Sequence, residues 1–73
     1  MSKNYHVVPH DGEWAVQREG ADRASSIHGT QAEAISAGRE LAQGTHGELR
    51  IHGSDGRIRE GYSYGHDPFP PRG

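Results

Sequence analysis

The residues of this 73-residue chain that could perform chemistry are first of all its histidines. His6 and His10 fall on one face of a predicted strand, but two pleats separate them, which is far for shared metal coordination. The remaining histidines show no ligand spacing, and no cysteine is present to anchor zinc. They are His28, His46, His52 and His66. We therefore expect no metal site and no bound cofactor.

A hydrolytic site is the second chemistry to consider. Asp22, Ser25 or Ser26, and His28 lie close in sequence, but the Gly-x-Ser-x-Gly elbow is missing. The glycine-rich segments around residues 44–47 and 53–56 are typical of turns, and no phosphate-binding Gly-x-x-x-x-Gly-Lys-Ser/Thr string occurs. We therefore expect a protein that is not an enzyme.

The strongest surface signal is cationic. Arg50, His52, Arg57 and Arg59 are predicted to share one face of a hairpin, where they could bind phosphates. The alternative is a solvated strand face whose charges protect the sheet edge from aggregation. No aromatic side chain interleaves with these residues, so the stacking platform of single-strand binders is missing.

These residues must be positioned by two hairpins and a helix. Asp11-Gly12 between two alternating runs predicts a two-residue hairpin loop. Pairing then runs from His10 with Glu13 back to Tyr5 with Arg18. The larger apolar side chains fall on one face of this hairpin. They are Tyr5, Val7, Pro9, Trp14 and Val16.

Residues 30–43 are predicted to form the helix. Thr30 and Glu33 match a capping box, and Gly44 is a natural residue to follow the helix end. One stripe at helical spacing is apolar or small. It consists of Ala34, Ile35, Gly38, Leu41 and Ala42. Gly38 in mid-stripe lowers helix propensity, which a close approach of the helix to the sheet would explain.

The other strands are weaker or shorter. Residues 23–28 predict a third strand, and residues 48–52 and 57–62 predict the second hairpin. A loop of two or four residues puts the apolar side chains of this hairpin on one face. They are Leu49, Ile51, Ile58 and Tyr62. The proline-rich tail, residues 63–73, is predicted to be irregular. Tyr64 and Phe69 in it either strap the thin core or dock a partner.

Composition limits the class of protein. Hydrophobic residues make up only 30% of the chain, so the core must be thin, and a homodimer would add buried area. The net charge of −2 argues against a strongly basic nucleic-acid protein. No stretch is long and apolar enough for a membrane span, and neither a signal peptide nor cysteine is evident. These features favour a cytoplasmic location.

Several segments together resemble one bacterial family, Domain of Unknown Function 2188. The resemblance is carried by residues 6–16, the helix start at 30–34, the hairpin at 51–59 and the tail at 63–72. It implies a small bacterial protein with no assigned activity, and it supplies no catalytic or binding residues to transfer.

The sequence thus predicts an α+β fold with a mostly antiparallel sheet of about five short strands. The order is β-β-β-α-β-β, with one helix on one face of the sheet and a single domain over residues 1–62. The predicted function is a small non-enzymatic binding or interaction module with a protein partner. The alternative is a weak, phosphate-directed nucleic-acid binder that uses the arginine and histidine face.

Overall fold

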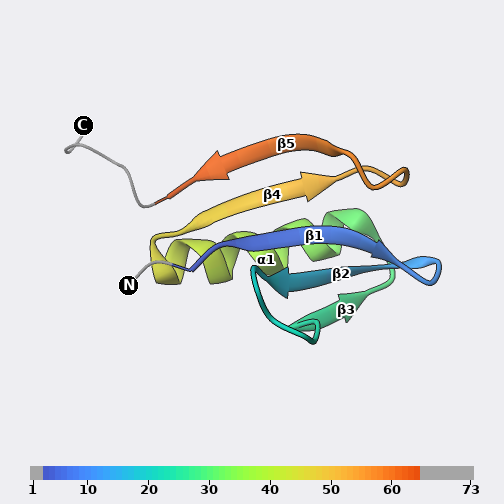
Figure 1. Cartoon of the computed structure of the whole chain (residues 1–73), viewed down its shortest axis with the longest axis horizontal. Helices are drawn as coiled ribbons and strands as arrows, with labels where there is room; N and C mark the ends of the chain where they lie inside the picture. The colour runs from blue at the N-terminus through green and yellow to red at the C-terminus, as the bar shows by residue number, and fades with distance from the viewer. Residues whose placement is uncertain (1–2, 65–73) are drawn as a thin grey trace.

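A computed structural model describes residues 3–64, and in this range the chain forms one five-stranded sheet and one helix (Figure 1). The elements are β1 (Tyr5–His10), β2 (Glu13–Arg18), β3 (Ser26–His28), α1 (Gln31–Thr45), β4 (Glu48–His52) and β5 (Ile58–Ser63). The strand order in the sheet is β3-β2-β1-β4-β5, and β1 and β4 are parallel while the other neighbours are antiparallel. The predicted α+β class and element order are confirmed.

The first hairpin has the predicted loop and the predicted register. Asp11 and Gly12 both have positive φ, 48° and 81°, as a two-residue type I′ turn requires. The pairs run from His10 with Glu13 to Tyr5 with Arg18. Trp14 faces the core as expected, although it is only half-buried.

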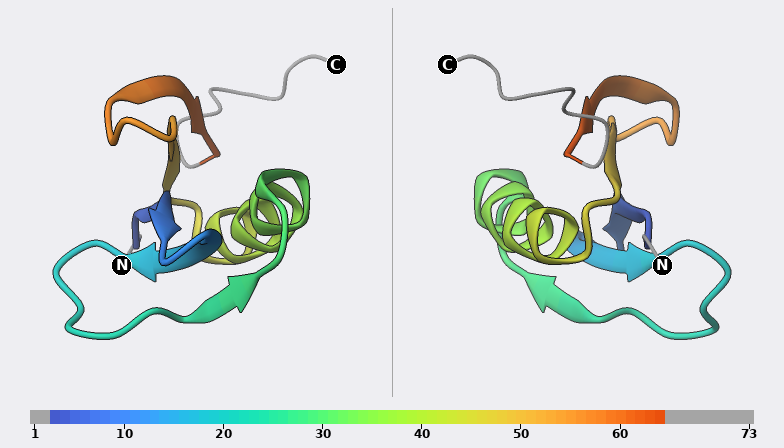
Figure 2. Two further views of the ribbon diagram at one scale, coloured as in Figure 1. Left: turned by 90° about the vertical axis from the view of Figure 1, so that its right-hand side faces the viewer. Right: turned by 90° about the vertical axis from the view of Figure 1, so that its left-hand side faces the viewer.

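The helix packs against one face of the sheet and leaves the other face uncovered (Figure 2). Its buried residues are small, namely Ala34, Gly38 and Ala42. A Cβ atom on Gly38 would lie 2.8 Å from Cδ1 of Leu49 and 3.4 Å from Cγ2 of Val7. The close approach inferred from Gly38 is therefore confirmed.

One member of the predicted helical stripe lies outside the core. Leu41 keeps 37% of its surface exposed, whereas Ala42 next to it is fully buried. On the sheet, Ala15 is buried although it points away from the helix. Its short side chain lies between Val8 on β1 and Ile27 on β3, which are longer and shield it.

The predicted helix end at Gly44 is wrong. The helix continues to Thr45, and His46 takes the left-handed conformation at φ 57°, with its N–H directed to the carbonyl groups of Ala42 and Gln43. Gly47 follows because its backbone approaches that of Lys3 so closely that a Cβ atom would overlap the Lys3 carbonyl. The glycine is needed for this contact, so histidine adopts the left-handed position.

The second hairpin differs from both predicted loops. The Gly53 N–H donates to the Arg57 carbonyl at 2.7 Å, which encloses a loop from Ser54 to Gly56. His52 pairs with Ile58, whereas Ile51 pairs with Glu60, so the register shifts by one residue between these two pairs. The shift is a β-bulge, which changes the side-chain alternation of one strand relative to its partner. Ile58 therefore does not share a face with Ile51, contrary to the prediction.

The end of the described chain lies on the domain. Ser63 is the last residue of β5, one residue past the predicted boundary, and Tyr64 packs against the core cluster. The Tyr64 N–H also donates to the Gly47 carbonyl at 2.9 Å. Phe69, the other aromatic residue proposed for the tail, lies outside the described residues.

Strand β5 forms one edge of the sheet, and all six of its residues are exposed. The Tyr62 hydroxyl donates a hydrogen bond of 3.0 Å to the Glu60 carboxylate, two residues earlier on the same face. This bond stabilises the neutral phenol, and the carboxylate charge opposes the phenolate. Both effects raise the pKa of Tyr62 above its usual 10.0.

Gly38 and Gly44 provide a matched pair of glycine-to-alanine substitutions in one helix. Gly38→Ala should lower the free energy of unfolding by about 1–2 kcal/mol. The clash with the buried Leu49 opposes, and should exceed, the gain of about 1 kcal/mol in helix propensity. Gly44→Ala meets no atom within 4 Å and should raise stability by up to about 1 kcal/mol. Urea denaturation measures both. Stabilisation by both substitutions would show that the helix is not pressed onto the sheet.

The hydrogen bond on β5 predicts a change in tyrosine ionisation. Glu60→Gln should lower the pKa of Tyr62 toward its ordinary value, because the opposing charge is removed. Phenolate absorbance would then appear at lower pH in the variant than in the parent chain. Glu13→Gln on β2 removes an equal charge far from β5 and is the control. An unchanged ultraviolet titration in Glu60→Gln would contradict the contact.

Candidate functional site

The candidate site lies on the face of the sheet that the helix leaves uncovered. One row of side chains crosses all five strands on this face. Ile27 pairs with Ala15, Ala15 with Val8, and His52 with Ile58. Continuing the β1–β4 register by one residue puts Val8 beside His52. The row is thus aliphatic except at His52, and its two ends are open to solvent, with Ile27 48% and Ile58 56% exposed.

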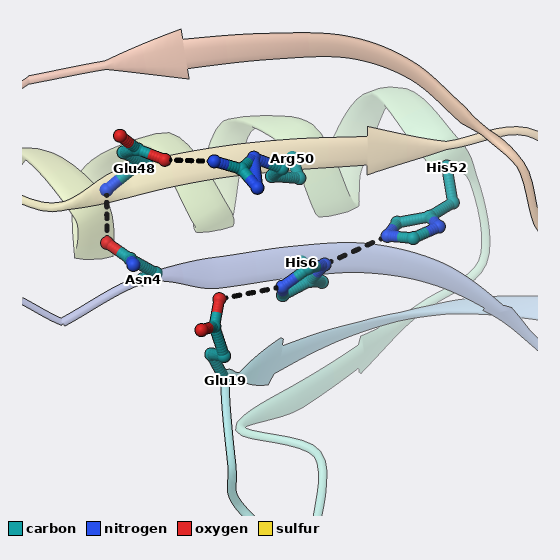
Figure 3. A network of polar contacts seen from close by, with 6 residues as sticks. All are labelled: Asn4, His6, Glu19, Glu48, Arg50 and His52. Atoms are coloured by element: carbon teal, nitrogen blue, oxygen red, sulfur yellow. Dashed lines mark hydrogen bonds and ion pairs between the residues drawn. The ribbon is translucent and has the colours of Figure 1, made fainter.

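The next row along the strands is polar. It contains Gln17, His6 and Arg50, which occupy aligned positions on β2, β1 and β4. Arg50 forms an ion pair with Glu48 on its own strand (Figure 3). The Gln17 amide donates to the Ala21 carbonyl at 2.7 Å. These polar groups therefore have partners within the chain.

His6 and His52 meet where the two rows adjoin. Nδ1 of His6 lies 2.9 Å from Nε2 of His52, and the ring centroids are 5.1 Å apart (Figure 3). The outer nitrogens are also engaged. Nε2 of His6 lies 3.2 Å from the Glu19 carboxylate, and Nδ1 of His52 lies 2.8 Å from the Gly56 carbonyl. A chain of four groups thus runs from the β2 end to the second hairpin loop.

A hollow of about 220 Å³ adjoins the histidine pair. Its lining consists of His6, Val8, Gln17, Arg18, Glu19, Gly20 and His52. The hollow combines two imidazoles, one carboxylate and one guanidinium. It can accept water or a small ion beside the rings.

The structure divides the four residues predicted to form a cationic face. Arg50 and His52 lie on the uncovered face, and Arg50 is paired with Glu48. The side chain of Arg59 reaches Gly53 and lines a different hollow between β5 and the helix. The Arg57 side chain, between the hairpin loop and β5, is 88% exposed and lies 3.9 Å from Asp55. The predicted shared face is wrong because the bulge in the second hairpin redirects β5.

The partnership of His6 with His52 was not found from the sequence. The two residues are 46 positions apart, and local spacing contains no signal for them. They meet because β1 and β4 are adjacent and parallel, with His6 opposite Arg50 in the register. His6 and His10, which share a strand face, were expected to be too far apart for shared coordination, and the hydrogen bonds of His6 within residues 3–64 go to His52 and Glu19.

The part of the chain that the structure describes contains neither a metal-binding cluster nor a membrane-spanning helix. Residues 3–64 hold no group of three or more histidine, cysteine, aspartate or glutamate residues arranged around one metal ion. The single helix in the same range is too short and too polar to cross a membrane.

Comparison with known proteins shows a family and a related bacterial protein to which this chain is similar. Residues 5–64 match the family model described as an uncharacterized protein conserved in bacteria, DUF2188. The uncharacterized protein YdaT of Bacillus subtilis (strain 168) is 41% identical over 59 residues, which are 81% of this chain and 39% of that protein. The chain therefore spans about two fifths of the relative's length. No solved structure matches. The family match covers the whole sheet and the helix, and this chain belongs to the DUF2188 family.

Proposed function

We propose that this chain is a non-enzymatic interaction module whose uncovered sheet face binds a second copy of the same unit. The observation that carries the proposal is the aliphatic row across that face. Four aliphatic residues, Ile27, Ala15, Val8 and Ile58, lie in line with His52 across the five strands, and α1 packs on the opposite face. The solvated face of a sheet usually carries polar side chains, so an aliphatic row on such a face favours a covering partner.

The charged side chains on this face are compatible with self-association because they are paired. Arg50 is neutralised by Glu48, and His6 contacts Glu19, so each protomer presents paired rather than single-signed charge. Two copies related by a two-fold axis would then bring no unbalanced like charges together. Two sheets can stack face to face about 10 Å apart, with their rows of side chains interdigitating. The thin core gives such an interface a stabilising role.

The lining of the hollow supports a role in binding rather than catalysis. It holds no serine, threonine, cysteine or lysine that could act as a nucleophile next to the histidine pair. A cytoplasmic location, which the lack of cysteine favours, is part of the same proposal.

Binding of nucleic acid by the arginine face is not supported by this geometry. A phosphate backbone requires several free cations on one surface. Here Arg50 has a carboxylate partner, Arg59 lies on the helix side, and Arg57 lies between the hairpin loop and β5, beside Asp55. The face that was expected to carry four cationic groups carries two, one of them paired.

Self-association is tested with charge substitutions at the two ends of the aliphatic row. The parent chain should show twice the monomer mass of 8.0 kDa in light scattering as its concentration rises. The double variant Ile27→Glu, Ile58→Glu should remain monomeric, because buried carboxylates would meet across the interface. Both positions are about half exposed, so the monomer should keep its circular dichroism spectrum.

Leu41→Glu is the matched control. Leu41 is also a large exposed aliphatic residue, but it lies on the helix, away from the proposed interface. This variant should dimerise as the parent does. A mass of 8.0 kDa for the parent at every concentration, or equal loss of dimer in both variants, would overturn the proposal.

A further inference from the structure

The hydrogen-bond pattern around His6 and His52 requires one proton more than two neutral rings supply. Three contacts follow one another, from the Glu19 carboxylate to His6, from His6 to His52, and from His52 to the Gly56 carbonyl. The ionised carboxylate and the carbonyl can only accept hydrogen bonds. Each contact needs one N–H, whereas two neutral imidazoles carry two in total. The pattern is therefore complete only when the pair holds one extra proton.

We infer that the His6–His52 pair is a one-proton site that makes self-association of the uncovered face depend on pH. This inference rests on the proposed function and names its regulation. Nδ1 of His6 and Nε2 of His52 are 2.9 Å apart, a separation at which one N–H donates to one lone pair. Histidine is also the side chain that ordinarily changes its charge between about pH 5 and 8.

A carboxylate next to the pair balances the charge of the added proton. The Glu19 oxygen lies 3.2 Å from Nε2 of His6, and the His6 side chain is only 23% exposed, so this charge is partly shielded from water. Arg18, which lines the same hollow, opposes the added proton from a position without a direct contact to either ring. The direct contact with Glu19 favours the singly protonated pair.

The other charged groups around the pair form ion pairs within the chain. They are Arg50 with Glu48 on β4, and Arg57 with Asp55 at the second hairpin loop. The remaining neighbouring elements contribute uncharged residues, namely Gln17 from β2, Ile58 from β5 and Gln31 from α1. The charge state of this part of the face therefore changes mainly with the histidine pair.

The protonation states of the pair differ in how well a second copy can cover them. With one extra proton, every ring N–H has an acceptor and the positive charge lies beside Glu19, so no polar group is buried without a partner. Without that proton, one of the three contacts is lost and the carboxylate charge is no longer balanced. With a second extra proton, N–H faces N–H between the rings and the inner hydrogen bond is lost. Self-association should therefore be strongest when the pair holds one extra proton.

Light scattering of the full chain from about pH 5 to about pH 9 tests this dependence. Two copies bring two such protons, so the dissociation constant of the dimer should rise by up to about 100-fold per pH unit on the alkaline side. Glu19→Gln should move this rise to lower pH, because the balancing charge is absent. His6→Gln should remove the rise, because an amide N–H can donate to His52 without an extra proton.

His28→Gln is the matched control. His28 bonds to Ser26 and pairs with Trp14, whose side chain faces the core, so it lies on the opposite face of the sheet. This variant should keep the pH dependence of the parent chain. Loss of that dependence in both His28→Gln and His6→Gln would overturn the assignment to the pair.

NMR of isotope-labelled imidazoles tests the proton site independently of association. At the pH of strongest association, both outer nitrogens should carry protons, and the two inner nitrogens should show a scalar coupling across their hydrogen bond. Neutral or uncoupled rings at that pH would overturn the site. A dimer whose dissociation constant is the same at every pH would overturn the regulation alone. A monomer at every pH would overturn the proposed function and the regulation together.

Discussion

The contact on which the rest of the structure depends is the close approach of α1 to the sheet at Gly38. With no side chain there, Leu49, Val7 and Val16 extend up to the helix backbone. Ala34 and Ala42, one turn away on either side, are fully buried and keep the separation small along the helix. A chain with few large apolar residues can exclude water in this way, because close packing substitutes for side-chain volume. The helix can lie this close to only one face, so the opposite face depends on its own side chains.

The parallel pairing of β1 with β4 decides what that opposite face contains. It places the first and fourth strands side by side at the centre of the sheet, although 46 residues separate His6 from His52. The N-terminal end of this pair is held by specific contacts. The Asn4 side-chain oxygen accepts from the Glu48 N–H at 2.9 Å (Figure 3). The Thr45 hydroxyl donates to the Lys3 carbonyl at 3.0 Å. These contacts hold the register that makes the two imidazoles meet.

Local chemistry in the sequence was sufficient to predict the first hairpin and the helix start. Asp11-Gly12 specifies a turn type by backbone conformation, and Thr30 accepts the hydrogen bond of the Glu33 N–H as its capping box predicts. The predicted loop and register of the second hairpin were wrong because Gly53 and Gly56 permit several loops, and a bulge cannot be recognised from the alternation of apolar residues alone. The predicted helix end was wrong because the close approach of Lys3 requires a glycine at position 47, and this contact joins segments that are distant in sequence. The contact between His6 and His52 could not be predicted for the same reason, because it too joins segments that are distant in sequence.

His52 interrupts an aliphatic row, and its surroundings explain how a polar ring can remain there. Burying an imidazole beside Val8 and Ile58 is unfavourable unless both ring nitrogens have partners. The Gly56 carbonyl accepts from one nitrogen, and the other faces His6. Ion pairs on an exposed sheet face contribute little to stability, so Arg50 with Glu48 and His6 with Glu19 do not by themselves explain the arrangement. The row supplies apolar area while the paired rings supply one directional polar site within it. An apolar surface with a single fixed polar centre is the pattern of a binding face, in which area gives affinity and the polar group gives orientation.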